Sequence, residues 1–170
     1  YIKNEKYVDS VYIISDEDSV ERVAKKNKVG FIKRPGRLKN PNLPLGKILK
    51  YCLQYIEGDN IFPEGVVYIN YLFPFRPNRL VDTLIFDLQY KGLDTVFSSY
   101  TDYGNYWKEV DNENFVQTGE SLAPRNIKHP LYRALYGVGC VTISSIIRSE
   151  ELIGDKVGIY PVSNLLYTLR

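Results

Sequence analysis

Two hydrophobic patterns alternate along the chain. Short apolar runs rich in β-branched and aromatic residues predict strands at 7–15, 66–69, 95–99, 138–143 and 157–162. Apolar residues at helical spacing follow most of these runs, at 18–28, 46–57, 78–91 and, in a short segment, after 144. Strand and helix repeated in this order are typical of an α/β fold. We therefore expect a three-layer sandwich with a mostly parallel sheet.

The stretch 65–79 organises the rest of the chain. Its apolar run Val66–Ile69 shows no alternation, as expected for a strand that is covered on both faces. A loop bounded by Pro74 and Pro77 follows, and a helical pattern that Asn78 can cap begins directly after it. Because open α/β folds bind ligands at the carboxyl ends of their strands, this loop is the first candidate for a functional site.

Two further segments depart from the strand and helix rhythm. Apolar runs at 106–110 and 115–116 flank a polar turn and predict a hairpin excursion. The stretch 23–56 contains no acidic residue and predicts either a phosphate or nucleic-acid site or a solvated helix end and loop. Its nine basic residues are Lys25, Lys26, Lys28, Lys33, Arg34, Arg37, Lys39, Lys47 and Lys50.

Composition limits the class of protein. With 170 residues and 44% hydrophobic content, the chain can bury one core, so we expect a single domain over 1–170. The net charge of +2 makes nucleic acid an improbable partner, and no apolar run is long enough to span a membrane. Cys52 and Cys140 fit two buried thiols in the reducing cytoplasm. A chain that begins at Tyr1 and contains no methionine is expected to be part of a larger protein.

Few residues match a general catalytic motif. Asp16-Glu17-Asp18 has the D-x-D form with which many glycosyltransferases hold a metal, but the same pattern occurs where Ser15 or Asp16 caps a helix, and we prefer the cap. No P-loop, G-x-G-x-x-G, G-x-S-x-G or Cys/His metal spacing occurs. The single histidine, His129, is interpreted as a loop residue.

The order of several short motifs resembles the sugar-acid cytidylyltransferases, and the CMP-sialic acid synthetases in particular. Those enzymes have a first motif S-T-D-D, then R-P-x-x-L, and then a strand ending in L-Q-P-T-S-P-L-R. The matching segments cover most of the chain and are Ser15-Asp16-Glu17-Asp18, Arg34-Pro35 with Leu38, Asn70 to Arg76, Lys108, Arg125 with Arg133, and Gly139 to Ile143.

The resemblance implies a nucleotide-diphospho-sugar transferase-like fold and a reaction that joins CTP to an acidic sugar of the sialic acid or Kdo type. Pyrophosphate would be released with the help of Mg²⁺. Arg34 matches a family arginine near the nucleotide, and Asn70 stands where a family glutamine contacts the sugar. The remaining candidates for sugar binding are Arg76 in the same loop and the basic residues Lys108, Arg125 and Arg133.

The chain departs from the family in ways that bear on activity. The family's glycine- and serine-containing phosphate segment would lie upstream of Tyr1, and its late metal-binding D-x-D would fall near Leu169. Leu72 and Phe73 stand where the family has hydroxyl side chains. Two functions stay open: a catalytically silent binding or structural module of a larger protein, which we favour, and an enzyme of glycan biosynthesis.

The two functions imply different partners. An active enzyme would take CTP and an acidic sugar, whereas a silent domain would bind other segments of its parent protein, and a homodimer is compatible with both. We also expect a gap in the sheet between the strands 7–15 and 66–69, because the family places its first strand there. Finally, the sugar-binding candidates should converge on one cleft.

Overall fold

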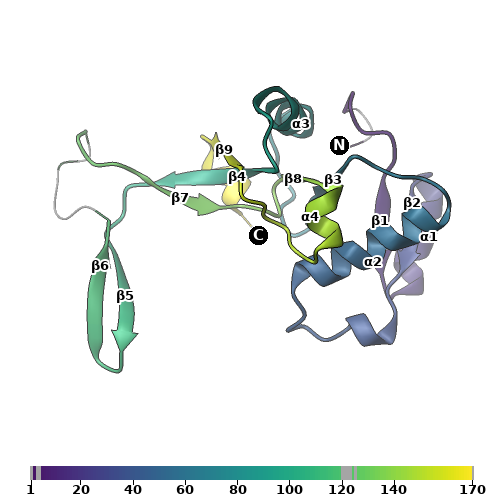
Figure 1. Ribbon diagram of the computed structural model, residues 1–170, viewed down its shortest axis with the longest axis horizontal. Coiled ribbons are helices and arrows are strands. Elements are labelled where there is room, and N and C mark those ends of the chain that lie inside the picture. Colours follow the sequence, from purple (N-terminus) through teal and green to yellow (C-terminus); the bar gives the residue numbers. More distant parts are fainter. Residues whose placement is uncertain (1, 3–4, 120–123, 125, 170) are drawn as a thin grey trace.

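The computed structural model describes residues 2, 5–119, 124 and 126–169. Among the predicted sugar-binding residues, Arg125 therefore lies outside the described residues. The described part of the chain contains nine strands and four α-helices (Figure 1). The first half contains β1 (Tyr12–Ser15), α1 (Asp18–Lys26), β2 (Gly30–Lys33), η2 (Gly36–Leu38), α2 (Leu45–Gly58), β3 (Gly65–Tyr68) and α3 (Leu80–Lys91). The second half contains β4 (Thr95–Asp102), β5 (Tyr106–Asp111), β6 (Asn114–Thr118), β7 (Leu131–Ala134), β8 (Cys140–Ile143), α4 (Ser144–Arg148), β9 (Val157–Val162) and η3 (Leu165–Thr168).

The main sheet is mostly antiparallel, so the prediction of a mostly parallel sheet is wrong. β3 is antiparallel to β8. Along one edge of β4, β8 pairs with the first residues of β4 and β7 with its last residues, and both pairings are antiparallel. Only β9, on the other edge of β4, runs parallel to it. The reason lies in the connection: β4 leads into the hairpin and the chain returns as β7 and β8 without a helix, and a return of this kind gives antiparallel neighbours.

The βα unit that the sequence predicted is present, and it is extended by a parallel strand, β2, that the sequence did not predict. α1 connects β1 to β2, and Ile14 lies beside Ile32 in the parallel register. β1 is shorter than predicted because the residues before it bind α3 instead: the backbone N–H groups of Lys6 and Tyr7 donate to the Asp82 carboxylate, both at 3.0 Å.

β1 and β2 form a separate two-stranded sheet. Within the described residues, neither of these strands pairs with β3. Gly30 N–H donates to the Val11 carbonyl and Arg34 N–H to the Ser15 carbonyl, each at 2.8 Å. Since neighbouring residues of a strand direct their backbone groups to opposite edges, Tyr12 and Ile14 present theirs to the edge away from β2. The sequence led us to expect a gap in the sheet beside β1. Within the described part of the chain, the strands do not form one continuous sheet that would contradict this gap.

Helices cover both faces of the main sheet at β3. Val67 packs with the core cluster that contains Leu80 and Leu84 of α3, whereas Val66 packs against Leu53 of α2. Successive strand residues point to opposite faces, so α3 and α2 form the outer layers around β3. Each fully buried leucine contributes about 1.5–3 kcal/mol to the free energy of unfolding. The three-layer arrangement therefore exists, although its sheet is mixed.

The two ends of the molecule differ in character. Figure 1 shows β1, β2 and α1 at one end, the main sheet in the middle and the β5–β6 hairpin projecting at the other end. Among the described residues, none of the helices has the length and apolar character needed to cross a membrane.

Candidate functional site

The loop that follows β3 is held to the 135–138 turn by Arg76. Arg76 Nε donates to the Val138 carbonyl at 2.9 Å, and Nη2 donates to the carbonyls of Asn70 and Gly137 at 2.6 and 3.1 Å. The Asn70 N–H in turn donates to the Gly137 carbonyl at 2.8 Å. The guanidinium is thus used to join two backbone segments of the same chain.

The side chain of Asn70 also has partners within the chain. Its Nδ2 donates to the Tyr68 hydroxyl at 3.1 Å, and its Oδ1 accepts the Leu72 N–H at 2.9 Å. The second bond is typical of an Asx turn, which fixes the direction of the loop. Asn70 and Arg76 are therefore brought together, as their shared motif suggested.

Phe73 does not extend into a ligand site. Its side chain is buried with Leu80 and Leu84 in the main core cluster. A Cβ atom added at Gly137 would lie 2.5 Å from the Phe73 ring, so the turn can approach the ring only because position 137 is glycine. The Phe73 ring is thus used for packing, while Leu72 stays exposed.

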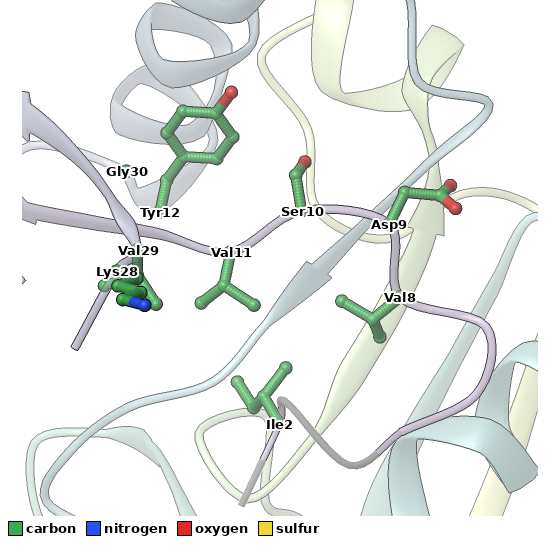
Figure 2. A pocket seen from close by; sticks show the side chains of 9 residues that line it. All are labelled: Ile2, Val8, Asp9, Ser10, Val11, Tyr12, Lys28, Val29 and Gly30. Atoms are coloured by element: carbon green, nitrogen blue, oxygen red, sulfur yellow. The ribbon is translucent and has the colours of Figure 1, made fainter.

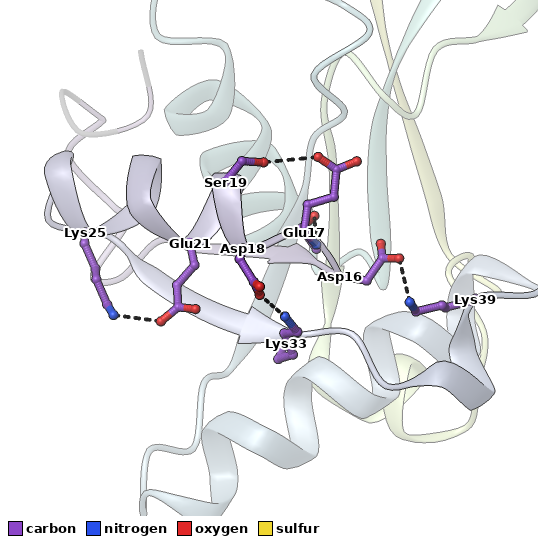
Figure 3. Close-up of polar contacts among 9 residues, drawn as sticks. Asp16, Glu17, Asp18, Ser19, Glu21, Lys25, Lys33 and Lys39 are labelled. Carbon is purple, nitrogen blue, oxygen red and sulfur yellow. Dashed lines mark hydrogen bonds and ion pairs between the residues drawn. The ribbon is translucent and has the colours of Figure 1, made fainter.

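A second polar cluster lies at the carboxyl ends of β1 and β2. The Asp16 carboxylate accepts Arg34 Nη2 at 2.7 Å and Lys39 Nζ at 3.0 Å. Figure 3 shows Lys39 directed toward Asp16 and Lys33 toward Asp18, the latter two in direct contact. The bonds from Lys39 and Arg34 hold the pKa of Asp16 well below its usual range. Asp16 is therefore ionised near neutral pH and is the counterion of two cations.

The preferred interpretation of the 15–18 segment as a side-chain cap is wrong. α1 begins at Asp18 with Glu17 at its N-cap, and no side chain accepts a capping hydrogen bond there. Ser15 Oγ accepts the Glu17 N–H at 3.2 Å instead, and Asp16 turns to Arg34. No group of three or more His, Cys, Asp or Glu side chains is placed to hold a metal within the described ranges.

The Nε donor of Arg34 is unpaired within the described residues. Its Nε atom is buried and lacks a hydrogen-bond partner within the described part of the chain. A buried donor without an acceptor costs free energy, about 1–3 kcal/mol in mutational studies. Arg34 consequently combines one satisfied nitrogen, Nη2, with a buried Nε that has no acceptor among the described residues.

The other predicted sugar-binding residues lie elsewhere. Lys108 is in β5 of the projecting hairpin, which Figure 1 places at the opposite end of the molecule from β1. Arg133 is in β7, where its guanidinium lies 5.4 Å from the centre of the Tyr100 ring. The structure thus joins Asn70 to Arg76 but separates Lys108 from both.

Sequence reasoning missed two groups of polar contacts. Lys39 was visible only as one of nine basic residues, and nothing in the local sequence indicates that it binds Asp16. Near the hairpin, Lys128 Nζ donates to the Tyr103 and Gly104 carbonyls at 3.0 and 2.9 Å. Both contacts join segments that are far apart in sequence, so no local pattern could have revealed them.

A cavity lies at the amino ends of β1 and β2. Its volume is about 480 Å³, and Figure 2 shows Val8, Val11 and Ile2 among its apolar lining residues and Asp9 and Ser10 among its polar ones. The Asp16 cluster occupies the opposite, carboxyl ends of the same strands. The cavity is therefore not the ligand site that strand direction predicted.

Comparison with known proteins identifies the fold. No protein-family model matches the chain, and no curated protein matches it. Among solved structures, CMP:2-keto-3-deoxy-manno-octonic acid synthetase complexed with CTP is similar at 11% identity and a TM-score of 0.61, over 95% of this chain and 76% of that chain. HddC from Yersinia pseudotuberculosis gives 14% identity and a TM-score of 0.46, over 88% and 67% of the two chains. The first similarity shows that the chain has a cytidylyltransferase-like fold.

Proposed function

We propose that this chain is a catalytically silent cytidylyltransferase-like domain that serves as a binding or structural module of a larger protein. The observation that carries the proposal is the use of its two candidate arginines. Arg34 is bound to the Asp16 carboxylate, and Arg76 is bound to three backbone carbonyls. Neither guanidinium is presented to a substrate as a complete, unoccupied donor set.

The Asp16 carboxylate is the strongest obstacle to nucleotide phosphates. It occupies the position between Arg34 and Lys39 where an incoming phosphate would have to bind, and its depressed pKa keeps it ionised. A phosphate would have to displace Asp16 from both cations or bind beside a like charge. The internal carboxylate therefore replaces the anion that this pair of cations could otherwise bind.

An active enzyme is the second candidate, and two observations favour it. The similar synthetase is bound to CTP, and Arg34 Nε is a buried donor without a partner in the described residues. In that case CTP and an acidic sugar would be the substrates. Mg²⁺ would neutralise the leaving pyrophosphate, and Asp16 and Asp18 would be the first candidates to hold it.

A pyrophosphate-release assay separates the two functions. Purified chain is incubated with CTP, Mg²⁺ and a panel of sialic, legionaminic, pseudaminic and Kdo sugars, beside an active synthetase. We expect no turnover above the blank. Turnover that disappears in Arg34→Ala but persists in Arg37→Ala, an exposed arginine three residues away, would refute the silent function.

A binding experiment tests the role assigned to Asp16. Asp16→Asn removes the internal counterion, so its affinity for CTP, measured by calorimetry, should exceed that of the wild type at least tenfold. Asp18→Asn removes the same charge from a residue that contacts Lys33 instead, and it should leave CTP binding unchanged. Equal CTP affinity in the wild type and Asp16→Asn would contradict the proposed occupation of the site.

A further inference from the structure

The β5–β6 hairpin projects from the main sheet as an arm (Figure 1). Every residue of β5 is exposed, and so is every residue of β6 except Gln117. Buried apolar contacts hold most elements against their neighbours, and the strands of the arm bury almost no apolar surface. The direction of the arm is therefore set where it joins the sheet. We call this region the neck and define it as residues 102–106 together with Lys128 on the returning chain.

Asp102 folds the outgoing side of the neck. Its Oδ1 accepts the Gly104 N–H at 2.8 Å, and its Oδ2 accepts the Tyr106 hydroxyl. The hydrogen bonds from Tyr106 and Gly104 lower the pKa of Asp102, and the charges of Arg133 and Lys128 add to this effect. Asp102 is consequently ionised near neutral pH, and one carboxylate binds two different parts of the neck.

Lys128 joins the returning chain to the outgoing chain across the neck. Its Nζ donates to the Tyr103 and Gly104 carbonyls at 3.0 and 2.9 Å and to Asn105 Oδ1 at 2.6 Å. Because an ammonium group has three N–H donors, each donor of Lys128 has an acceptor here. The whole hairpin lies between Asn105 and Lys128 in the sequence, so these bonds close a loop that contains the arm.

The acceptors of Lys128 are uncharged oxygens, which distinguishes this contact from a surface ion pair. Fixing a lysine side chain costs conformational entropy, and a single exposed contact rarely offsets that cost. Three charge-assisted bonds from one ammonium group do offset it. Backbone carbonyl and asparagine oxygens are also the uncharged groups with which proteins enclose cations. The three oxygens of residues 103–105 therefore form a cradle for a cation, and the Lys128 ammonium occupies it.

We propose that the Lys128 ammonium fixes the direction of the arm by filling this cradle, so that Lys128 is a positioning residue for the hairpin. Without an ammonium group in the cradle, the outgoing and returning chains lose their connection at the neck. The hairpin then keeps its own strand pairing but swings as a unit. The direction of the arm decides which surfaces it can reach, whether the domain is catalytic or silent.

Time-resolved fluorescence anisotropy of Trp107 measures this motion. Trp107 is the single tryptophan of the chain and lies in β5. In Lys128→Ala, the part of its anisotropy that decays faster than the molecule tumbles should increase about twofold or more, because a released element of this size moves on the nanosecond scale. Lys91→Ala is the matched control. Lys91 Nζ also donates to an oxygen, Asp87 Oδ2 at 2.9 Å, but on α3, so its loss should leave the motion of Trp107 unchanged.

Chemical rescue tests whether the ammonium group is the cause. The n-propylammonium ion replaces the side-chain atoms that Lys128→Ala removes, so its addition should return the Trp107 anisotropy of this variant toward the wild-type decay. Tetramethylammonium at the same ionic strength carries the same charge but has no N–H donor, and it should have no effect. Neither ion should alter the anisotropy of the wild type.

Hydrogen exchange of the β5 and β6 amides separates swinging of the arm from unfolding. The amides that pair the two strands should exchange at equal rates in the wild type and in Lys128→Ala. A hairpin that unfolds in the variant would overturn the proposal, because Lys128 would then stabilise the hairpin rather than direct it. Unchanged Trp107 motion in Lys128→Ala would overturn it as well. So would the absence of rescue by n-propylammonium, or equal rescue by tetramethylammonium.

Discussion

Replacement of Arg76 by methionine tests whether this arginine is a structural residue. Methionine keeps an apolar side chain of similar length but donates no hydrogen bond. The substitution leaves the carbonyls of Asn70, Gly137 and Val138 without the guanidinium that now donates to them at 2.6–3.1 Å. The loop after β3 and the 135–138 turn would then lose their main polar connection.

The expected cost follows from the number of bonds. A hydrogen bond contributes about 1 kcal/mol net to stability, and more when one partner is charged. Three bonds therefore predict a loss of about 3 kcal/mol in the free energy of unfolding. For a domain of this size about 1 kcal/mol corresponds to about 2–4 °C. The melting temperature of Arg76→Met should accordingly fall by about 6–12 °C.

Urea and thermal unfolding followed by circular dichroism measure this loss. Arg76→Lys should recover part of the stability, since an ammonium can reach some of the same carbonyls. Arg22→Met, on the exposed side of α1, is the matched control and should change the free energy of unfolding by less than about 0.5 kcal/mol. An Arg76→Met variant as stable as the control would show that the three bonds do not hold the loop, and it would return Arg76 to the candidates for substrate binding.

Three further predictions concern packing, charge and thiol reactivity. Gly46→Ala should lower the free energy of unfolding by about 3 kcal/mol or more in urea titrations, because its Cβ would lie 1.7 Å from the backbone carbonyl oxygen of Glu150. The control is Gly58→Ala in the last turn of the same helix, α2. It should be neutral or slightly stabilising, because a Cβ there would have nothing within 4 Å. Asp16→Asn should be less stable than the wild type at pH 7. Since the pKa of Asp16 is depressed in the folded state, this difference should begin to shrink as the pH falls below the ordinary carboxyl value of 3.8, and it should disappear only as the pH falls through the depressed pKa of the folded state, in an acid titration of stability. Burial raises the pKa of Cys140 to about 12 and that of Cys52 to about 11, so a thiol reagent at pH 8 should label the folded protein far more slowly than the urea-unfolded protein, and Cys140 last.

Several elements could be predicted from the sequence because local patterns determine them. Helical spacing over 46–57 and 78–91 predicted α2 and α3 to within two residues, and Gly92 ends α3 in the left-handed conformation, with φ of 59°. The two apolar runs around a polar turn predicted β5 and β6. In each case residues close in sequence decide the conformation, through the period of the hydrophobic pattern or the backbone freedom of glycine.

The candidate site could be predicted only in part. Asn70 and Arg76 are in one loop, so their proximity follows from the sequence. The partners of Asp16 do not, because Arg34 and Lys39 are about twenty residues away and reach it only after β2 has paired beside β1. The separation of Lys108 from the β3 loop likewise depends on the direction in which the hairpin leaves β4.

By itself, the sequence determined most of the strands and the long helices, which of their faces are apolar, and that a βα unit begins the chain, but it did not reveal β2 or β7. The direction of the main sheet was decided only by the tertiary structure. A strand's apolar pattern is the same whichever way its neighbour runs, so Val66 and Val67 could predict burial on two faces but not the antiparallel β8 beside them. The same holds for charges: a carboxylate and a guanidinium can be counted in the sequence, but whether they meet each other or a ligand depends on the distances that folding sets.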